Sequence, residues 1–222
     1  MNSTSSTHRR LRSAPQPGAP AFLWWLVGIM ALIELVLTLS SYGIFGTQDL
    51  RWPAFALGAF WQPLLWGAAQ PIYPGQTVLM FLTYAFLHGG MLHLAMNSVV
   101  LLSLGKHVCS HFGARRTLLV LFLAAVGGAA TFGLLAPSDA PMIGASGAVF
   151  GLIGLWQGTD YSARRRSGLS VQPIIVAVLG LVAANIGLMF ILGGGLAWQA
   201  HLGGWLVGWL AAQGFVRRRE TV

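Results

Sequence analysis

GASGAVFGLIGLWQGTDY, residues 144–161, is an apolar stretch that predicts a short membrane helix beginning at Ser146. Its small residues recur at helical spacing, at Gly147, Gly151 and Gly154. WQAHLGGWLVGWLAAQGFV, residues 198–216, is a second apolar stretch and carries a GxxxG pair, Gly204 and Gly208. Small residues at such spacing let two membrane helices approach closely. The two stretches are therefore predicted to be neighbouring helices of a membrane bundle.

The composition excludes an ordinary soluble domain. Of the 222 residues, 55% are hydrophobic and only 8% are charged, a balance typical of a polytopic membrane protein. The net charge of +8 could indicate nucleic-acid binding, but 12 of the 13 Lys and Arg residues lie in short clusters beside apolar stretches. Such clusters are topology anchors, so no nucleic-acid partner is expected. The single cysteine, Cys109, permits neither an internal disulfide nor a cysteine metal cluster.

Apolar stretches of membrane-crossing length lie at residues 21–41, 77–104, 116–136, 146–161, 171–193 and 198–216. The predicted fold is therefore an all-α membrane bundle of six transmembrane helices. Basic residues cluster before the first stretch, between the second and third, between the fourth and fifth, and after the sixth. By the positive-inside rule, both termini are expected to face the cytoplasm.

The chain is predicted to divide into a membrane domain, residues 21–216, and two tails. Residues 1–20 are polar, basic and interrupted by proline, which is typical of a disordered cytoplasmic tail. Residues 217–222 are expected to form a short basic cytoplasmic tail. Residues 42–76 are rich in Trp, Phe and Pro and are predicted to lie in the outer membrane interface.

A serine and a histidine lie at the predicted outer ends of two helices. With a helical rise of about 1.5 Å per residue, Ser146 lies roughly 27 Å from the cytoplasmic anchor at Arg164. His201 lies roughly 24 Å from the anchor at Arg217, which places both side chains at nearly one level. A serine and a histidine within hydrogen-bond reach are a nucleophile and its general base. This pairing predicts an intramembrane serine hydrolase, reached by water through a cavity open to the outside.

The second stretch adds hydrogen-bond donors. His93 and Asn97, in LHGGMLHLAMN, are four residues apart and share one helix face. Both can donate to developing negative charge, as can the free N–H groups at the start of the Ser146 helix. Measured from Lys106, however, His93 lies roughly 20 Å up and Asn97 roughly 14 Å up, lower than the serine and histidine pair. An oxyanion role therefore requires this helix to protrude or tilt, and the alternative role is interhelical hydrogen bonding.

No carboxylate is well placed to complete a triad. Asp160 lies roughly 21 Å deeper than Ser146, and Asp139 lies in the turn before it. A Ser146–His201 dyad is therefore predicted, in which packing or another hydrogen bond has to orient the imidazole. No metal ion and no organic cofactor are expected.

These motifs resemble those of the rhomboid family of intramembrane serine proteases, over all six stretches. The family pattern has a histidine and an asparagine in the second span, Gly-x-Ser-Gly at the start of the fourth, and Ala-His with GxxxG in the sixth. The matching residues here are His93 and Asn97, Gly144 to Gly147, and Ala200, His201, Gly204 and Gly208. A GxSG motif alone is weak, but three motifs in this order are specific.

The resemblance implies that Ser146 is the nucleophile, that His201 is the general base, and that His93, Asn97 and the Ser146 amide stabilise the oxyanion. Substrates would be transmembrane segments of other proteins, cut near the outer membrane face. Phe150 stands where many rhomboids have a tyrosine, so stacking under His201 is expected without a hydroxyl contact. The remaining expected site residues are Gly144 and Gly147, which support the site, and Gly151, Gly204 and Gly208, which pack the helices.

Three residues receive no clear role from the sequence. Glu34 lies in the middle of the first stretch, where ionisation is costly, and is expected to face the bundle in a protonated or hydrogen-bonded form. His88 is expected to be structural. Arg51-Trp52 reverses the order of a Trp-Arg pair found in the outer loop of bacterial rhomboids.

Two other classes of function compete with the hydrolase. A non-catalytic rhomboid-like scaffold would bind client transmembrane helices without cutting them, and such relatives typically lose the serine or the histidine, both of which are present here. A transporter would show repeated halves with paired broken helices, and the sequence has no such repeat. The expected setting is the bilayer of a bacterial inner membrane, and the sequence carries no signal for the oligomeric state.

Overall fold

A computed structural model describes residues 18–46, 49–136 and 140–220, with side chains described as far as residue 215 in the last helix. Its elements are α1 (Ala21–Ser41), α2 (Arg51–Gly58), α3 (Gln62–Leu65), α4 (Gln76–Thr83), the 3₁₀ helix η1 (Tyr84–Phe86), α5 (Met91–Phe112), α6 (Ala114–Leu135), α7 (Ser146–Arg166), α8 (Gln172–Ile191) and α9 (Trp198–Glu220). The predicted all-α class is confirmed for this part of the chain, in which the only β pairing is an isolated bridge between Phe60 and Met142.

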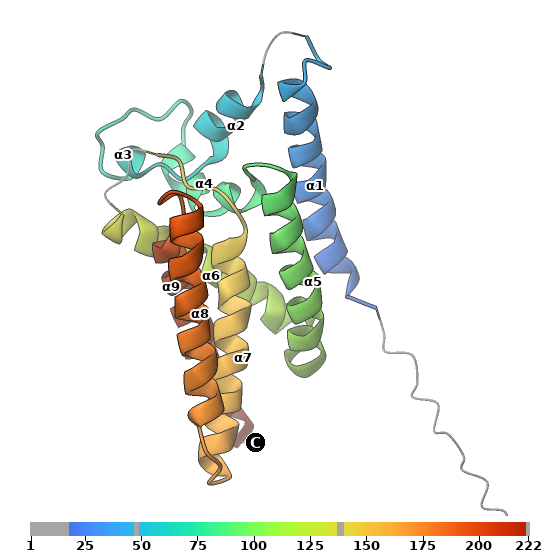
Figure 1. The fold of residues 1–222 in the computed structure, drawn as a ribbon, viewed down its shortest axis with the longest axis vertical. Helices are drawn as coiled ribbons and strands as arrows, with labels where there is room; N and C mark the ends of the chain where they lie inside the picture. The colour runs from blue at the N-terminus through green and yellow to red at the C-terminus, as the bar shows by residue number, and fades with distance from the viewer. Residues whose placement is uncertain (1–17, 47–48, 137–139, 221–222) are drawn as a thin grey trace, which may run out of the picture.

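Within the described residues, four helices are long and apolar enough to cross a membrane, namely α1, α5, α6 and α8. The helices α1, α5, α7 and α8 run in roughly the same direction, α6 crosses behind them at an angle, and the short helices α2, α3 and α4 gather at the end where α7 and α9 begin (Figure 1). α7 packs against both α6 and α9, and ten of its residues are buried. α8 is the opposite case, because Ile174 is its only buried residue. α7 is therefore at the centre of the bundle and α8 at its periphery.

Glycines bring α7 and α9 into backbone contact, as their spacing predicts. A methyl group added to Gly204 would collide with the backbone of Gly147, and one added to Gly208 would collide with Gly151. Polar side chains join the same two helices farther along, since Trp205 Nε1 donates to Gln157 Oε1 at 2.7 Å. The close approach places the first turn of α9 beside the first turn of α7.

The predicted stretch 77–104 is not one helix, and this prediction was wrong. α4 ends at Thr83, η1 follows, and the chain then turns before α5 begins at Met91. Gly90 has a φ of +138°, which favours glycine and interrupts the helical path. α5 continues to Phe112, so Lys106 lies inside the helix and not at its end. Apolar residues on both sides of the turn hide the break from a hydropathy reading.

The segment predicted to lie in the outer interface packs onto the bundle. Phe60 is fully buried and makes edge-to-face contacts with Phe81, Tyr84 and Phe132. Its backbone exchanges hydrogen bonds of 3.0 and 2.9 Å with Met142, in the turn that leads into α7. This segment therefore helps to hold the start of α7 in place.

The predicted tails fall mainly outside the described residues. Residues 1–17 and 221–222 are not described, so the predicted disordered tail, residues 1–20, stays a prediction. At the other end, the α9 backbone continues to Glu220, past the predicted domain boundary at residue 216.

Candidate active site

The site is built around the first turn of α7. Ser146 is the first residue of this helix and is half-buried. No side chain caps the helix start at Ala145, so the N–H groups of the first turn are left for another acceptor. Gly144 has a φ of +112°, and its N–H donates to the Tyr84 carbonyl at 2.9 Å. The turn before Ser146 is therefore held by the backbone and requires glycine.

His93 and Asn97 lie against this turn. A methyl group on Gly144 would be 2.8 Å from His93 Nε2 and 3.9 Å from Asn97 Nδ2. The predicted difference in depth disappears, because His93 lies in the first turn of α5 and the helix extends to Phe112. Measured along the helix from Phe112, His93 lies roughly 28 Å away, which is close to the roughly 27 Å between Ser146 and Arg164.

The hydrogen bond to His93 indicates which ring nitrogen carries the proton. The Gly89 N–H donates to His93 Nδ1 at 3.4 Å, a long bond in which Nδ1 must be the acceptor. A neutral ring then carries its proton on Nε2, the nitrogen that faces Gly144. Asn97 Nδ2 donates to the His93 carbonyl at 3.1 Å, which fixes the amide on the same helix. Both side chains are thus arranged as donors beside the Ser146 turn.

His201 lies in the first turn of α9 and is 6% exposed. Its ring stacks on Phe150, with centroids 4.0 Å apart and planes inclined by 10°. Phe150 is one helical turn after Ser146 and shares its helix face. The stacking expected from the sequence is present, and it places the imidazole beside the face of α7 that carries the serine.

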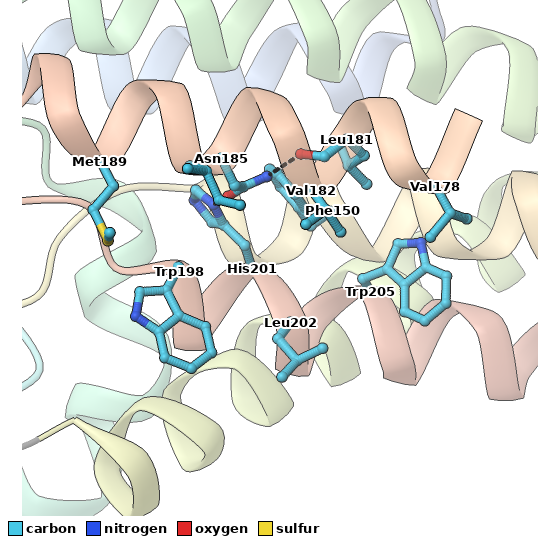
Figure 2. Close-up of a pocket in the computed structure, with 11 residues that line it drawn as sticks. Phe150, Val178, Leu181, Val182, Asn185, Met189, Trp198, His201, Leu202 and Trp205 are labelled. Atoms are coloured by element: carbon cyan, nitrogen blue, oxygen red, sulfur yellow. Dashed lines mark hydrogen bonds between the residues drawn. The ribbon is translucent and has the colours of Figure 1, made fainter. Parts of the chain in front are cut away.

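A residue that the sequence analysis missed completes the surroundings of His201. Asn185 of α8 places Oδ1 2.6 Å from His201 Nδ1, while its Nδ2 donates to the Leu181 carbonyl at 2.9 Å (Figure 2). A polar side chain inside an otherwise apolar membrane stretch was the available signal, because such residues are costly unless they have a partner. Its partner lies across a turn, on the next helix.

A cavity of about 540 Å³ opens between α7, α8 and α9, with His201 and Asn185 in its wall (Figure 2). Its other lining side chains are mostly aliphatic or aromatic, including Phe150, Val182 and Trp198. An apolar space with a few polar groups is typical of a binding site for an apolar ligand or chain segment. The described part of the chain brings no three His, Cys, Asp or Glu side chains together in a way that could hold a metal ion.

Some expected contacts are absent from the described residues. No hydrogen bond there joins Ser146 Oγ to His201, although catalytic hydrogen bonds are often long before substrate binds. Asp160 pairs with Arg164 at 3.1 Å, near the other end of α7, and does not approach His201. Asp139 lies outside the described residues.

The structure assigns contacts to the residues that the sequence left without a role. Glu34 is fully buried and forms a two-pronged ion pair with Arg51, with N···O distances of 2.9 and 3.2 Å. Arg51 Nη1 also donates to the His88 carbonyl at 3.0 Å, in the turn before α5. The His88 ring is fully buried, 5.0 Å from the His93 ring, and neither of its nitrogens has a hydrogen-bond partner among the described residues. These contacts link α1 and α2 to the turn that precedes His93.

Comparisons with known proteins agree with the motifs. The profile of the rhomboid domain family matches residues 75–218. RHOMBOID-like protein 4 of Arabidopsis thaliana is 36% identical over 147 residues, which cover 66% of this chain and 36% of that protein. Rhomboid protease GluP of Bacillus subtilis is 28% identical over 197 residues, covering 89% and 35%, respectively. Inactive RHOMBOID-like protein 8 of Arabidopsis thaliana is 27% identical over 150 residues, covering 59% and 42%. The chain thus spans less than half the length of these relatives.

Proposed function

The chain belongs to the rhomboid family, and on that premise we propose that it is a serine endopeptidase that cuts transmembrane segments of other membrane proteins near the outer membrane face. Ser146 is the nucleophile and His201 is the general base. His93, Asn97 and the N–H groups at the start of α7 are the donors to the oxyanion.

One observation carries this proposal: the hydrogen-bond partners of the two histidines favour opposite tautomers of their neutral rings beside one helix start. His93 accepts a bond at Nδ1, which leaves an Nε2–H donor facing Gly144. His201 has an amide oxygen at Nδ1, which leaves Nε2 without a proton in the neutral ring. Acyl transfer requires one group that accepts the serine proton and others that donate to the developing oxyanion. The arrangement supplies both.

The proposed reaction proceeds through an acyl-enzyme. Ser146 Oγ attacks the carbonyl carbon of the peptide bond as its proton passes to His201 Nε2, and the oxyanion receives hydrogen bonds from His93, Asn97 and the α7 amides. The C–N bond then breaks, and His201 gives its proton to the leaving amine. Water attacks the ester, again losing a proton to His201, and the C–Oγ bond breaks as that proton returns to Ser146.

We further propose that α7 and α9 cross the bilayer together with the four more apolar helices, giving six spans with both termini in the cytoplasm. Helices at the centre of a bundle contact protein more than lipid, so they tolerate glycines and polar side chains that a lipid-facing helix does not. The ten buried residues of α7 support this arrangement. The basic clusters favour cytoplasmic termini, and we propose a bacterial inner membrane as the setting.

A non-catalytic scaffold that binds client helices is the second candidate. It is favoured by the likeness to a protein named as an inactive rhomboid and by the absence of a Ser146–His201 hydrogen bond among the described residues. The presence of both Ser146 and His201 favours the endopeptidase.

Covalent labelling with a fluorophosphonate separates the two candidates. The wild-type protein, purified in detergent, is expected to be labelled, whereas Ser146→Ala and His201→Ala are not. Ser103→Ala is the matched control, because Ser103 is an exposed serine of α5 that bonds only to its own helix and should not affect labelling. A folded wild-type protein that resists labelling would favour the scaffold.

A further inference from the structure

We propose that Asn185 of α8 is a positioning residue for His201, which holds the imidazole in the tautomer and ring orientation that leave Nε2 free to accept a proton. The proposal rests on the proposed function, since Nε2 has a proton to accept only if Ser146 is the nucleophile. Asn185 is thus assigned the part that a carboxylate plays in a Ser-His-Asp triad, without the negative charge.

The orientation of the Asn185 amide follows from its second hydrogen bond. A carbonyl oxygen can only accept, so the Asn185 atom 2.9 Å from the Leu181 carbonyl is the Nδ2 donor. The other amide atom, Oδ1, is then the one that lies 2.6 Å from His201 Nδ1. Because Oδ1 can only accept, Nδ1 must carry the proton in this bond. A neutral His201 therefore has its lone pair on Nε2.

Stacking on Phe150 does not determine which side of the His201 ring faces Asn185. The two ring planes are inclined by only 10°, so the contact restricts the tilt of the imidazole. A half-turn of the ring about its Cβ–Cγ bond leaves it in the same plane and keeps the stacking intact. That half-turn would exchange a nitrogen for a carbon opposite Asn185 Oδ1 and lose the hydrogen bond. Phe150 therefore fixes the plane, and Asn185 selects the orientation within it.

The surroundings leave His201 Nδ1 few other partners. Apart from Asn185 and two tryptophans, the cavity that His201 lines is walled by apolar side chains, among them Val182, Ile186 and Met189. The nearest helix of the bundle core, α7, presents Phe150 to the ring. A buried imidazole nitrogen without a partner is costly, so the bond to Asn185 also favours the native position of the ring.

The test compares Asn185→Leu, which removes the acceptor, with Asn185→Asp, which keeps an acceptor and adds charge. Gln172→Leu is the matched control, because Gln172 is an exposed amide side chain at the start of the same helix. The first readout is the pair of His201 ring-nitrogen chemical shifts in ¹⁵N-histidine-labelled protein, assigned by their loss in His201→Ala. The second is the rate of fluorophosphonate labelling as a function of pH.

We expect a protonated Nδ1 in wild type and in the Gln172→Leu control, and a mixture of tautomers in Asn185→Leu. Labelling of Asn185→Leu should be about tenfold slower, the effect of one lost orienting hydrogen bond. Asn185→Asp should retain labelling, with the acid limb of its pH profile moved to higher pH because a carboxylate stabilises the imidazolium.

Three results would count against different parts of the account. Wild-type nitrogen shifts and a wild-type labelling rate in folded Asn185→Leu would overturn the role of Asn185 while leaving the serine hydrolase intact. If Asn185→Leu changes the His201 nitrogen shifts but the wild-type protein is never labelled, the proposed function is overturned. The contact with Asn185 would then still determine the His201 tautomer. An Asn185→Asp profile that coincides with wild type would also count against the proposal.

Discussion

Replacing Arg51 by methionine removes the partner of a carboxylate that has no access to water. Glu34 is fully buried, and its contacts are Arg51 and the Thr38 hydroxyl. Breaking a buried pair on one side costs about 3–5 kcal/mol, because the other charge stays buried without compensation. Since 22% of the Arg51 side chain remains exposed, we expect the lower value, about 3 kcal/mol. For a chain of this length that corresponds to a fall in Tm of roughly 6–12 °C.

The assay is thermal unfolding in detergent, followed by tryptophan fluorescence, with two comparison variants. Arg164→Met breaks the Asp160–Arg164 pair, which is about one-third exposed on both sides, and should change the stability by less than about 1 kcal/mol. The double variant Glu34→Met with Arg51→Met leaves no charge at this buried pair. Its Tm should therefore recover at least half of the fall expected for Arg51→Met alone. An unchanged Tm for Arg51→Met, or a double variant less stable than either single one, would refute this reasoning.

Three shorter predictions concern other positions. Gly204→Ala places a methyl group against the α7 backbone and should lower Tm by several degrees in the same assay, whereas Gly180→Ala, where the space is open, should not. Gly144→Ala combines a left-handed φ of +112° with a clash against the neighbouring imidazole, so the fluorophosphonate labelling rate should fall at least tenfold. The Asp49 carboxyl accepts a hydrogen bond from the Arg51 N–H, which holds its pKa below the ordinary value of 3.8. The resulting stabilisation of α2 is fully present above pH 3.8 and is lost as the pH falls through the lowered pKa of Asp49. Amide hydrogen exchange in α2 should therefore become faster at low pH in wild type and not in Asp49→Asn.

The sequence was most informative where local spacing alone determines a contact. The glycines at positions 147, 151, 204 and 208 identified the α7–α9 interface, because glycines four residues apart lie on one face of their helix and let a second helix approach it. The glycine contacts depend on helical periodicity, which can be read without knowing the tertiary structure. The stacking of His201 on Phe150 was expected only from the resemblance to rhomboids, and the structure contains it.

The sequence was less informative where a contact depends on how helices are arranged. Hydropathy joined α4 and α5 into one stretch, because apolar residues lie on both sides of the turn at Gly90, and the depth of His93 was misjudged as a result. The partners of Glu34 and His201, namely Arg51 and Asn185, lie on other helices, 17 and 16 residues away in sequence. No periodic pattern connects such positions, so the pairs became visible only once the bundle was assembled.

The central claim is that His201 activates Ser146 as a nucleophile, and peptide mass spectrometry of the fluorophosphonate-treated protein tests it most directly. We predict one adduct, on the peptide that contains Ser146, which is absent from His201→Ala and present in Ser103→Ala. An adduct on any other residue, or an adduct on Ser146 that forms as fast without His201, would contradict the account.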